Sequence, residues 1–337
     1  MVPGMHETPT RTAPDRNTSG GFNYLDDGVK PSLYRNGRVL TRRDADGNDD
    51  GTTGLSTREV ELDVFDARAL VGSAPLTCDA NGFELLDAPL PDDRFDFLDH
   101  ATVVTAYYGQ CARLVAERTG ARVFPFDHNI RSISGKRSAR RIAGGQQVQE
   151  PLHLVHGDYT LTSAPQRLRD LTRPPGGNDT LSSILPAGET LIDPATAERA
   201  LDGGRFAIVN VWRNIAETPV EAHPLALCDS RTVVPDDLVV FEIHYRDRIG
   251  ENYFARHADA HRWYYYPRMT RDEALLIKQW DSAGTFARTN GTQADAEQTG
   301  APRTFSFHSA FDDANAPQNA PDRWSIEVRC MVVYDGN

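Results

Sequence analysis

Long apolar runs and positive charge are both scarce in this chain of 337 residues. No stretch approaches the roughly 18 consecutive apolar residues of a membrane span, and the first twenty residues lack the apolar segment of a secretory signal. Lys and Arg number 36 against 48 Asp and Glu, so the net charge of -12 repels nucleic acid and anionic membranes. We therefore expect a cytoplasmic protein with a small-molecule substrate and no nucleic-acid or membrane partner. We expect it to be a monomer or a homodimer, with a pathway enzyme as a further candidate partner.

Cysteine is also rare. The four cysteines are far apart in the chain and form no C-x-x-C pair. This spacing argues against a structural zinc site and against a disulfide framework. We expect reduced, mostly buried thiols.

The chain divides by composition into a polar start and one long domain. Residues 1–52 contain little that can pack and are expected to form a tail or a surface arm. Residues 53–337 are expected to form a single domain, in which residues 53–120 support the rest. Within this support region, residues 55–71 alternate polar and apolar side chains like a strand, and residues 95–118 carry a helical periodicity that ends at Gly120.

After Gly120 the sequence reads mainly as short strands separated by Gly, Pro, Asn and Asp. This pattern predicts a mainly β protein, a double-sheet antiparallel barrel or jelly roll (cupin-like), with flanking α-helices. The segment 270–273 is an alternative start of a short helix. The predicted strands are 122–130, 152–155, 206–212, 225–228, 238–245, 261–266, 274–280, 304–311 and 324–334.

An H-x-D triplet, His156-Gly157-Asp158, follows directly on the apolar run 152–155. In extended chain, residues two apart point to the same side, so this imidazole and this carboxylate can reach one ion. Gly157 removes bulk where the backbone approaches the site. The triplet alone is a weak signal, because two polar residues on a turn look the same.

A second segment strengthens the metal hypothesis. His308 lies in a strand-like run, and a turn-rich stretch then leads to Arg323 and Ser325. A hairpin centred near residues 316 and 317 places His308 opposite Ser325, with Arg323 one inward-facing step away. Two histidines and one carboxylate form the facial triad that suits iron(II) and dioxygen. Arg323, with Ser325, then binds the distal carboxylate of 2-oxoglutarate as a rigid fork.

Several longer motifs resemble one family of oxygenases. They are NVWRNI (210–215), HPLALCDSRTV (223–233), HRWYYYPRMTRDEALLIKQWDS (261–282), FHSAFDD (307–313) and RWSIEVR (323–329). In this order they are similar to a family of bacterial and fungal specialised metabolism. The family includes the cephamycin 7-alpha-methoxylation component, fungal gibberellin-desaturase-like hydroxylases and aziridine-forming amino-acid oxygenases.

The resemblance covers about residues 122–334 and implies a double-stranded β-helix that depends on iron(II), 2-oxoglutarate and O2. It places the family's H-x-D on His156 and Asp158, its distal histidine on His308, and its R-x-S on Arg323 and Ser325. The sequence departs from the family at Asn214, where proline is usual, and at Trp324, where an acidic residue is common.

Other side chains compete for these roles or extend the site. His261 is the main rival of His308, His128 is expected to be structural, and Arg329 is the runner-up to Arg323. Asn210, Trp212 and Arg213 are candidates for substrate binding, because they emerge from an otherwise apolar strand. Tyr159 is a candidate contact of the cofactor.

The function expected from these residues is oxidation of a small metabolite in natural-product biosynthesis. The enzyme hydroxylates, desaturates or oxidatively cyclises its substrate and releases succinate and CO2. A carboxylate on the substrate is suggested by the basic loop 136–141 and by Arg213. The alternatives are a jelly-roll protein that binds a small acid without turnover, and a cupin-type metal-dependent hydrolase or isomerase.

Overall fold

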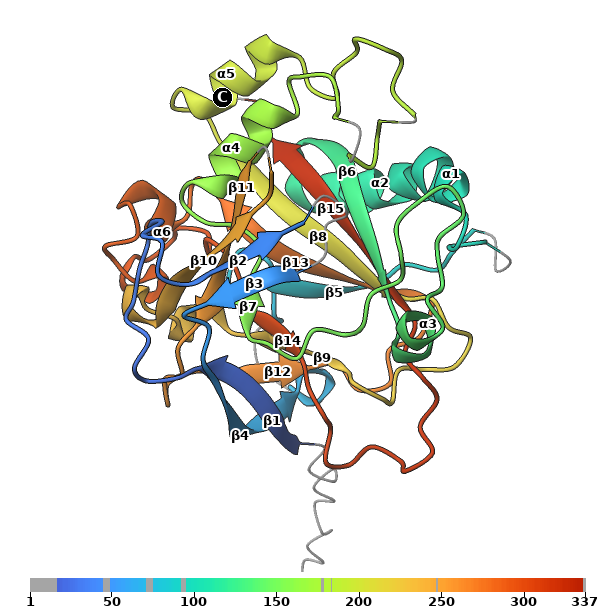
Figure 1. Cartoon of the computed structure of the whole chain (residues 1–337), viewed down its shortest axis with the longest axis vertical. Helices are drawn as coiled ribbons and strands as arrows, with labels where there is room; N and C mark the ends of the chain where they lie inside the picture. The colour runs from blue at the N-terminus through green and yellow to red at the C-terminus, as the bar shows by residue number, and fades with distance from the viewer. Residues whose placement is uncertain are drawn as a thin grey trace, which may run out of the picture.

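The computed structural model describes residues 17–44, 49–70, 75–91, 95–176, 179–182, 184–246 and 248–335. Within them the protein consists mainly of two β-sheets, as the sequence predicts (Figure 1). The larger sheet has the order β1-β4-β12-β9-β14-β7-β11-β10-β2-β3, and the smaller has the order β5-β13-β8-β15-β6. The strands are β1 (Thr18–Leu25), β2 (Leu40–Arg43), β3 (Asp49–Thr53), β4 (Thr57–Asp66), β5 (Phe83–Asp87), β6 (Arg122–Arg131), β7 (His156–Gly157), β8 (Phe206–Asn214), β9 (Leu225–Cys228), β10 (Leu238–His244), β11 (Ile249–Ala255), β12 (Trp263–Tyr265), β13 (Glu273–Asp281), β14 (His308–Ala310) and β15 (Ser325–Val333).

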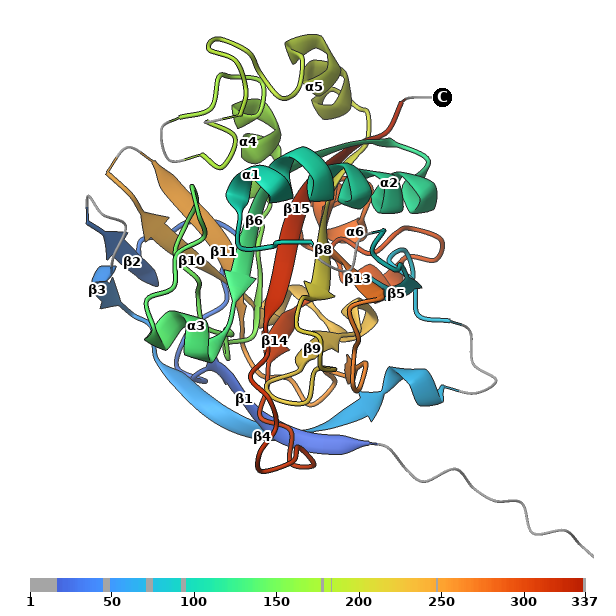
Figure 2. The same cartoon turned by 90° about the vertical axis from the view of Figure 1, so that its right-hand side faces the viewer.

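The helices are short and lie outside the sheets. α2 packs on β6, β8 and β15, and Figure 2 shows it crossing the outer face of the smaller sheet. α2 ends at Gly120, whose left-handed φ of 65° no side chain with a Cβ adopts easily. The helical segments are α1 (His100–Thr102), the π-helix η2 (Val103–Tyr107), α2 (Tyr108–Thr119), α3 (Ile133–Arg137), α4 (Ser163–Asp170), α5 (Pro194–Leu201), α6 (Thr285–Arg288) and the 3₁₀ turns η1 (Ala67–Ala69), η3 (Ser230–Thr232), η4 (Pro235–Asp237) and η5 (Asp295–Glu297).

Both faces of the smaller sheet are covered, which explains the long apolar runs in its sequence. Every residue of β8 is buried, and β15 is buried except at Arg329. One face packs on α2 and the other faces the larger sheet, so neither side of these strands reaches water. The polar side chains that remain on the inner face therefore require partners inside the molecule.

The N-terminal region corrects one prediction. We expected residues 1–52 to form a tail or a surface arm, but β1 pairs along its whole length with β4, and Phe22 and Tyr24 are fully buried. The ring of Phe22 lies 4.7 Å from that of Trp263. The prediction failed because the apolar positions of β1 stand between Gly and Asn residues, which made the segment look unable to pack. Residues 1–16 lie outside the described residues.

Two smaller expectations also differ from the structure. Segment 270–273 forms a turn, in which the Glu273 carboxylate accepts a hydrogen bond from the Thr270 amide, and β13 begins there. Residues 152–155 form no strand apart from an isolated bridge between Leu154 and Asn23, and regular pairing begins with β7 at His156. The strand expected over 304–311 is shorter, because only β14 pairs regularly there. The sequence also missed β5 and β11.

Candidate metal centre

Strand pairing in the larger sheet brings the two predicted histidines together. β14 lies between β7 and β9, and His308 is directly opposite His156 on β7. Asp158 follows two residues after His156, where the chain leaves β7. The H-x-D segment and the distal histidine therefore meet although about 150 residues separate them, as the register of adjacent strands requires.

The three side chains can share one ion. His156 Nε2 lies 3.6 Å from Asp158 Oδ1, and the rings of His156 and His308 are 4.3 Å apart. One ligand atom from each of the three residues lies within 4.8 Å of the other two. Side chains at positions 156 and 158 are less than a tenth exposed, and His308 is 3% exposed, so the site is closed to bulk water.

The surroundings keep both imidazoles neutral and the carboxylate charged. Burial lowers the pKa of His156 to about 3, with a further contribution from His308, and burial also lowers the pKa of His308. Burial by itself would raise the pKa of Asp158, but the charge of Arg329, with the adjacent His308 and His156 rings and the Asn210 hydrogen bond, holds it well below its usual value. Neutral imidazole and ionised carboxylate are the forms that bind a metal.

Hydrogen bonds orient two of these ligands. His156 Nδ1 lies 2.7 Å from the carbonyl oxygen of Leu154, which leaves Nε2 free to face the site. Asn210 Nδ2 donates to Asp158 Oδ2 at 3.0 Å, and the Asp158 amide donates to Gln279 Oε1 at 3.1 Å. Such outer contacts fix the direction of a metal ligand and adjust its basicity.

The predicted hairpin between the distal histidine and the R-x-S segment is wrong. β14 belongs to the larger sheet, and β15, which begins at Ser325, belongs to the smaller sheet and pairs with β6 and β8. The turn-rich stretch 311–324 thus crosses from one sheet to the other. His308 faces His156 instead of Ser325. Strand pairing within the larger sheet therefore brings the two imidazoles together, and not a hairpin to the R-x-S segment.

Arg323 is buried and has no anionic partner. Its Nη1 donates to the carbonyl of His223, its guanidinium carbon lies 5.6 Å from the ring of Trp212, and its Nε has no hydrogen-bond partner. No carboxylate of the described residues forms an ion pair with it. Burial, together with the charge of Arg131, lowers the pKa of Arg323 to about 9. Because buried charges are normally paired, this guanidinium is suited to an anionic ligand.

Arg329 has a different environment. Its Nη1 lies 2.8 Å from Asp127 Oδ2, its Nε lies 3.3 Å from Asp158 Oδ2, and its Nη2 lies 3.7 Å from Glu327 Oε1. Burial alone would lower the pKa of Arg329, but the nearby carboxylates raise it well above its usual value. This guanidinium is already saturated with protein carboxylates, so it holds Asp158 in place.

The predicted substrate-binding residues separate into two groups. Asn210 and Trp212 point to the inner face of β8, where they contact Asp158 and Arg323. Arg213 points to the outer face, since its Nε donates to the Tyr107 hydroxyl at 3.0 Å and its Nη1 donates to a backbone carbonyl. The prediction that Arg213 lines the substrate pocket is wrong, because side chains alternate along a strand and position 213 has the opposite parity from 210 and 212.

The rival histidines occupy structural positions. His261 Nδ1 lies 3.1 Å from the Tyr24 hydroxyl, and its Nε2 lies 3.1 Å from Asp237 Oδ2. His128 Nδ1 lies 2.9 Å from the Tyr108 hydroxyl, and burial lowers the pKa of His128 to about 4. Each ring is thus engaged by a tyrosine of another element.

Sequence reasoning missed the parts played by Gln279 and Glu327. Gln279 is fully buried on β13 next to Asp158, and its Nε2 has no partner. Glu327 shares the inner face of β15 with Ser325 and Arg329, and burial, followed by the charge of Asp158, raises its pKa. Both residues are polar positions within mostly apolar strands, and this was the signal in the sequence that could have identified them. Tyr159, the predicted cofactor contact, is buried near Arg329, and burial raises its pKa to about 12.

Comparison with known proteins identifies the family. Residues 22–333 match the family described as "YDMC: Oxidoreductase/YMDC permease-like domain", and the chain belongs to it. The chain is 45% identical over 195 residues to an uncharacterised protein of Methylophilus leisingeri, an alignment that covers 57% of this chain and 88% of that protein. It is 32% identical over 238 residues to the Fe(II)/2-oxoglutarate-dependent dioxygenase nvfI of Aspergillus novofumigatus, covering 69% of this chain and 68% of that protein.

The chain is a member of the Fe(II)/2-oxoglutarate-dependent oxygenases. A solved structure of the iron and alpha-ketoglutarate-dependent endoperoxidase NvfI superposes with a TM-score of 0.69 at 22% identity, over 95% of this chain and 99% of that chain. This similarity confirms the predicted jelly-roll fold. The oxygenase thus uses iron(II), 2-oxoglutarate and O2, as predicted. In the part of the chain that the structure describes, no helix is both long and apolar enough to cross a bilayer.

Proposed function

We propose that His156, Asp158 and His308 hold the iron(II) of this oxygenase, and that Arg323 and Ser325 hold the distal carboxylate of 2-oxoglutarate. One observation carries the proposal: two neutral imidazoles and one ionised carboxylate converge in a buried site. The same inner region contains a buried guanidinium that lacks an anion.

The donor set fits iron(II). Two imidazole nitrogens and one carboxylate oxygen suit a divalent transition metal that keeps open positions for small ligands. His156 presents Nε2 because its Nδ1 lies against the Leu154 carbonyl, and this arrangement is common for metal-binding histidines. The iron, with 2-oxoglutarate and O2 bound, supplies the oxidising power for an unactivated C–H bond.

The overall reaction consumes one 2-oxoglutarate, one O2 and one substrate. The keto acid loses CO2 and gains one oxygen atom to become succinate. The other oxygen atom enters an alcohol product, or leaves as water when the substrate loses two hydrogens in a desaturation or cyclisation. Relatives named hydroxylase/desaturase, such as efuI of Hormonema carpetanum, fit this range of outcomes.

The protein's own residues bind, orient and exclude water in this scheme. Arg323 offers two parallel N–H donors to a carboxylate, a geometry that fixes the keto acid's direction as well as its affinity. Arg329, Asn210 and Gln279 hold Asp158, so the ligand does not reorient between the steps of the reaction. Burial of these groups strengthens their electrostatic interactions.

The substrate is proposed to be a small metabolite that enters from the end of the barrel near His223. A concavity of about 610 Å³ lies there. It adjoins Arg323, whose Nη1 bonds to the carbonyl of His223. Arg137 on its rim supports a carboxylate-bearing substrate in place of Arg213. The lining consists of Ile133, Ser134, Arg137, Ser138, Ala222, His223, Ala320 and Asp322.

A cytoplasmic location is also proposed. All four cysteines are free thiols, and three of them are buried. Unpaired cysteines are typical of a reducing compartment.

The metal assignment is tested by His308→Ala and Asp158→Ala, with His244→Ala as the control, because His244, whose Nε2 lies 2.8 Å from Glu242 Oε2 on β10, lies outside the triad. The iron(II) affinity measured by anaerobic titration and the rate of succinate release should each fall by more than about 100-fold in the site variants. This loss exceeds the 10- to 100-fold typical of changing a residue that only contacts a metal ligand. The control should behave like the wild type. Full succinate release from a site variant would refute the assignment, and succinate release that does not depend on 2-oxoglutarate would indicate a different reaction.

A further inference from the structure

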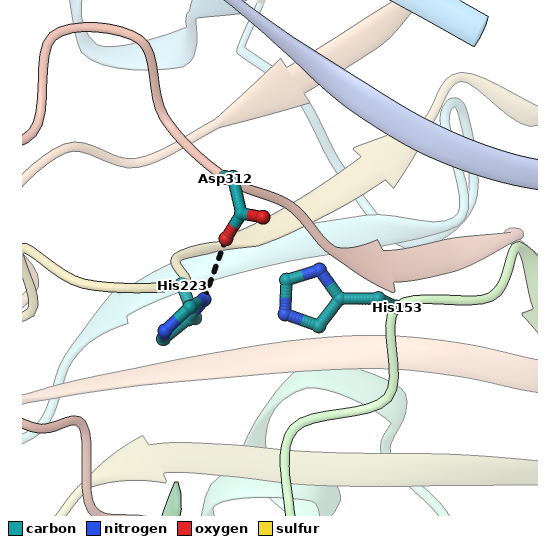
Figure 3. Close-up of side chains that lie close together, drawn as sticks. All are labelled: His153, His223 and Asp312. Carbon is teal, nitrogen blue, oxygen red and sulfur yellow. Dashed lines mark ion pairs between the residues drawn. The ribbon is translucent and has the colours of Figure 1, made fainter. Parts of the chain in front are cut away.

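A second group of side chains that can bind a metal lies just beyond the ends of β7, β9 and β14. It consists of His153, His223 and Asp312, and one ligand atom of each lies within 4.8 Å of the other two. Figure 3 shows the His153 ring directed toward the other two side chains, which come from separate loops. The rings of His153 and His223 are 5.1 Å apart and nearly perpendicular.

The strand register explains why these residues meet. Beyond the His308–His156 pair, the Ala310 amide donates to the Leu152 carbonyl, and the Phe311 amide donates to the Pro224 carbonyl. Asp312, the next residue along the chain, therefore lies beside the segments that contain His153 and His223. His153 is three residues from His156, or about 10 Å along extended chain, so the second cluster is separate from the first.

His223 and Asp312 already lie in contact. The Nδ1 atom of His223 is buried, lies 2.8 Å from Asp312 Oδ1 at the distance of an ion pair, and has no hydrogen bond from the described residues. An imidazole nitrogen and a carboxylate oxygen this close can bind the same cation.

The backbone holds the cluster in position. His223 has a φ of 47°, in the left-handed region that a residue with a side chain rarely adopts. Its carbonyl accepts the hydrogen bond from Arg323, and the His153 carbonyl accepts one from Asn23 Nδ2 at 2.7 Å. Burial, together with the charges of His223 and Arg323, lowers the pKa of His153, although Asp312 opposes the shift.

We propose that His153, His223 and Asp312 form a second site for a divalent metal ion, of the kind that zinc(II) occupies. Two imidazoles and one carboxylate with an open fourth position are an established zinc ligand set. An ion there joins the loops before β7 and β9 to the end of β14. It also fixes the loop whose carbonyl accepts the Arg323 hydrogen bond.

The site is tested by zinc(II) titration of the metal-free, full-length protein, measured by calorimetry and by metal analysis after desalting. Zinc also enters the first triad, so the wild type should bind two ions. Asp312→Asn and His308→Ala should each bind one ion, and the double variant should bind none. His257→Ala is the matched control, because His257, whose Nδ1 lies 3.9 Å from Asp259 Oδ1, belongs to neither cluster, and this variant should bind two.

The outcomes separate this proposal from the iron assignment. If Asp312→Asn binds as many ions as the wild type, the second site is refuted whatever happens at His308. If only His308→Ala leaves the count unchanged, the second site stands and the first assignment fails. Asp312 is 72% exposed, so its amide variant should fold, and circular dichroism checks this. Cobalt(II) in the His308→Ala background should give the visible absorption of a tetrahedral site, and its persistence in a further His223→Ala variant would also refute the proposal.

Discussion

At the scale of single residues, the two arginines of the R-x-S region differ mainly in their neighbours. Arg323 is buried with an Nε that has no partner, whereas Arg329 contacts Asp127, Asp158 and Glu327. Burial without a counter-ion destabilises a charge, and a ligand carboxylate removes that cost. The same residue type therefore serves one role at position 323 and another at position 329.

Replacing Arg323 should weaken 2-oxoglutarate binding and leave the metal in place. Charge-assisted hydrogen bonds contribute about 1.5–3 kcal/mol, so Arg323→Ala should raise the KM for 2-oxoglutarate roughly 10- to 150-fold. Arg323→Lys keeps the charge but loses the planar fork, so its KM should lie between those of Ala and wild type. Steady-state succinate release measures both. An unchanged KM in the Ala variant would contradict the role given to Arg323.

Replacing Arg329 should affect the metal first. Arg329→Lys keeps a positive charge but cannot bridge Asp127 and Asp158 in the same way. Losing this outer contact should lower iron(II) affinity about 10- to 100-fold. Anaerobic titration with a competing chelator measures it. A shift only in the KM for 2-oxoglutarate, with iron affinity intact, would mean that Arg329 is the keto-acid ligand.

At the scale of elements, β13 ends in a buried ionic cluster. Lys278 Nζ lies 2.9 Å from Asp281 Oδ2, and Arg205 Nη2 lies 2.7 Å from the same oxygen. Burial raises the pKa of Asp281, but Lys278 and Arg205 outweigh it and lower that pKa below its usual value. The lysine has the opposite shift, since its pKa is raised by Asp281 and Asp79 against the effect of burial.

Asp281→Asn should destabilise the protein by about 3–5 kcal/mol at pH 7, because it removes the buried carboxylate that pairs with the buried Lys278 and leaves that ammonium with Asp79, whose side chain is 72% exposed. The folded pKa of Asp281 is depressed, so its contribution is complete above the unfolded value near 4 and is lost as the pH falls through the folded value. The difference between variant and wild type should therefore shrink in acid. Urea unfolding at several pH values measures this.

The control for this prediction is Asp27→Asn. Asp27 pairs with Arg58 at 2.9 Å, but its side chain is 76% exposed. An exposed pair contributes about 0–1 kcal/mol, so the control should change stability little. Equal losses in the two variants would show that the β13 cluster does not act as a buried network.

Elements also show where local sequence stops being informative. The short apolar runs of β9 and β10 predicted those strands closely, because strands buried in the core consist mostly of apolar residues. The prediction of a hairpin between β14 and β15 was wrong, because the sequence of a turn-rich stretch does not show whether the chain returns to the same sheet or crosses to another. β7 has only two residues, so its pairing with β14 has almost no local signal.

At the scale of the whole molecule, the metal should stabilise the fold first, and the keto acid should add to this stabilisation once the metal is bound. A ligand at 100 times its Kd contributes about 2.7 kcal/mol, which for a chain of this size corresponds to a few degrees in Tm. Manganese(II) should raise the Tm of the wild type by more than that of His308→Ala, in which only the second proposed metal site remains. Added 2-oxoglutarate should raise it further in the wild type and not in Arg323→Ala. Thermal unfolding monitored by fluorescence measures both steps, and an increment from the keto acid without metal would contradict this order of binding.

The N-terminal strands belong to this larger scale as well. β1 closes one end of the larger sheet through β4, and Gly20 permits its close approach, since a Cβ there would lie 2.5 Å from the Asp312 carbonyl oxygen. The contact partner is nearly 300 residues away. No pattern within residues 18–25 predicts a contact with a residue so distant in the chain.

The sequence by itself determined the class of the fold, the helix that ends at Gly120 and the choice of the three residues proposed as the triad, because periodicity, capping and residue chemistry act over a few positions. Only the tertiary structure decided how His308 reaches His156, that Arg213 faces away from the site, and that β1 belongs to the core. Those outcomes depend on register and on which sheet a strand joins. These are set by packing between distant segments, and a one-residue shift turns a side chain to the opposite face.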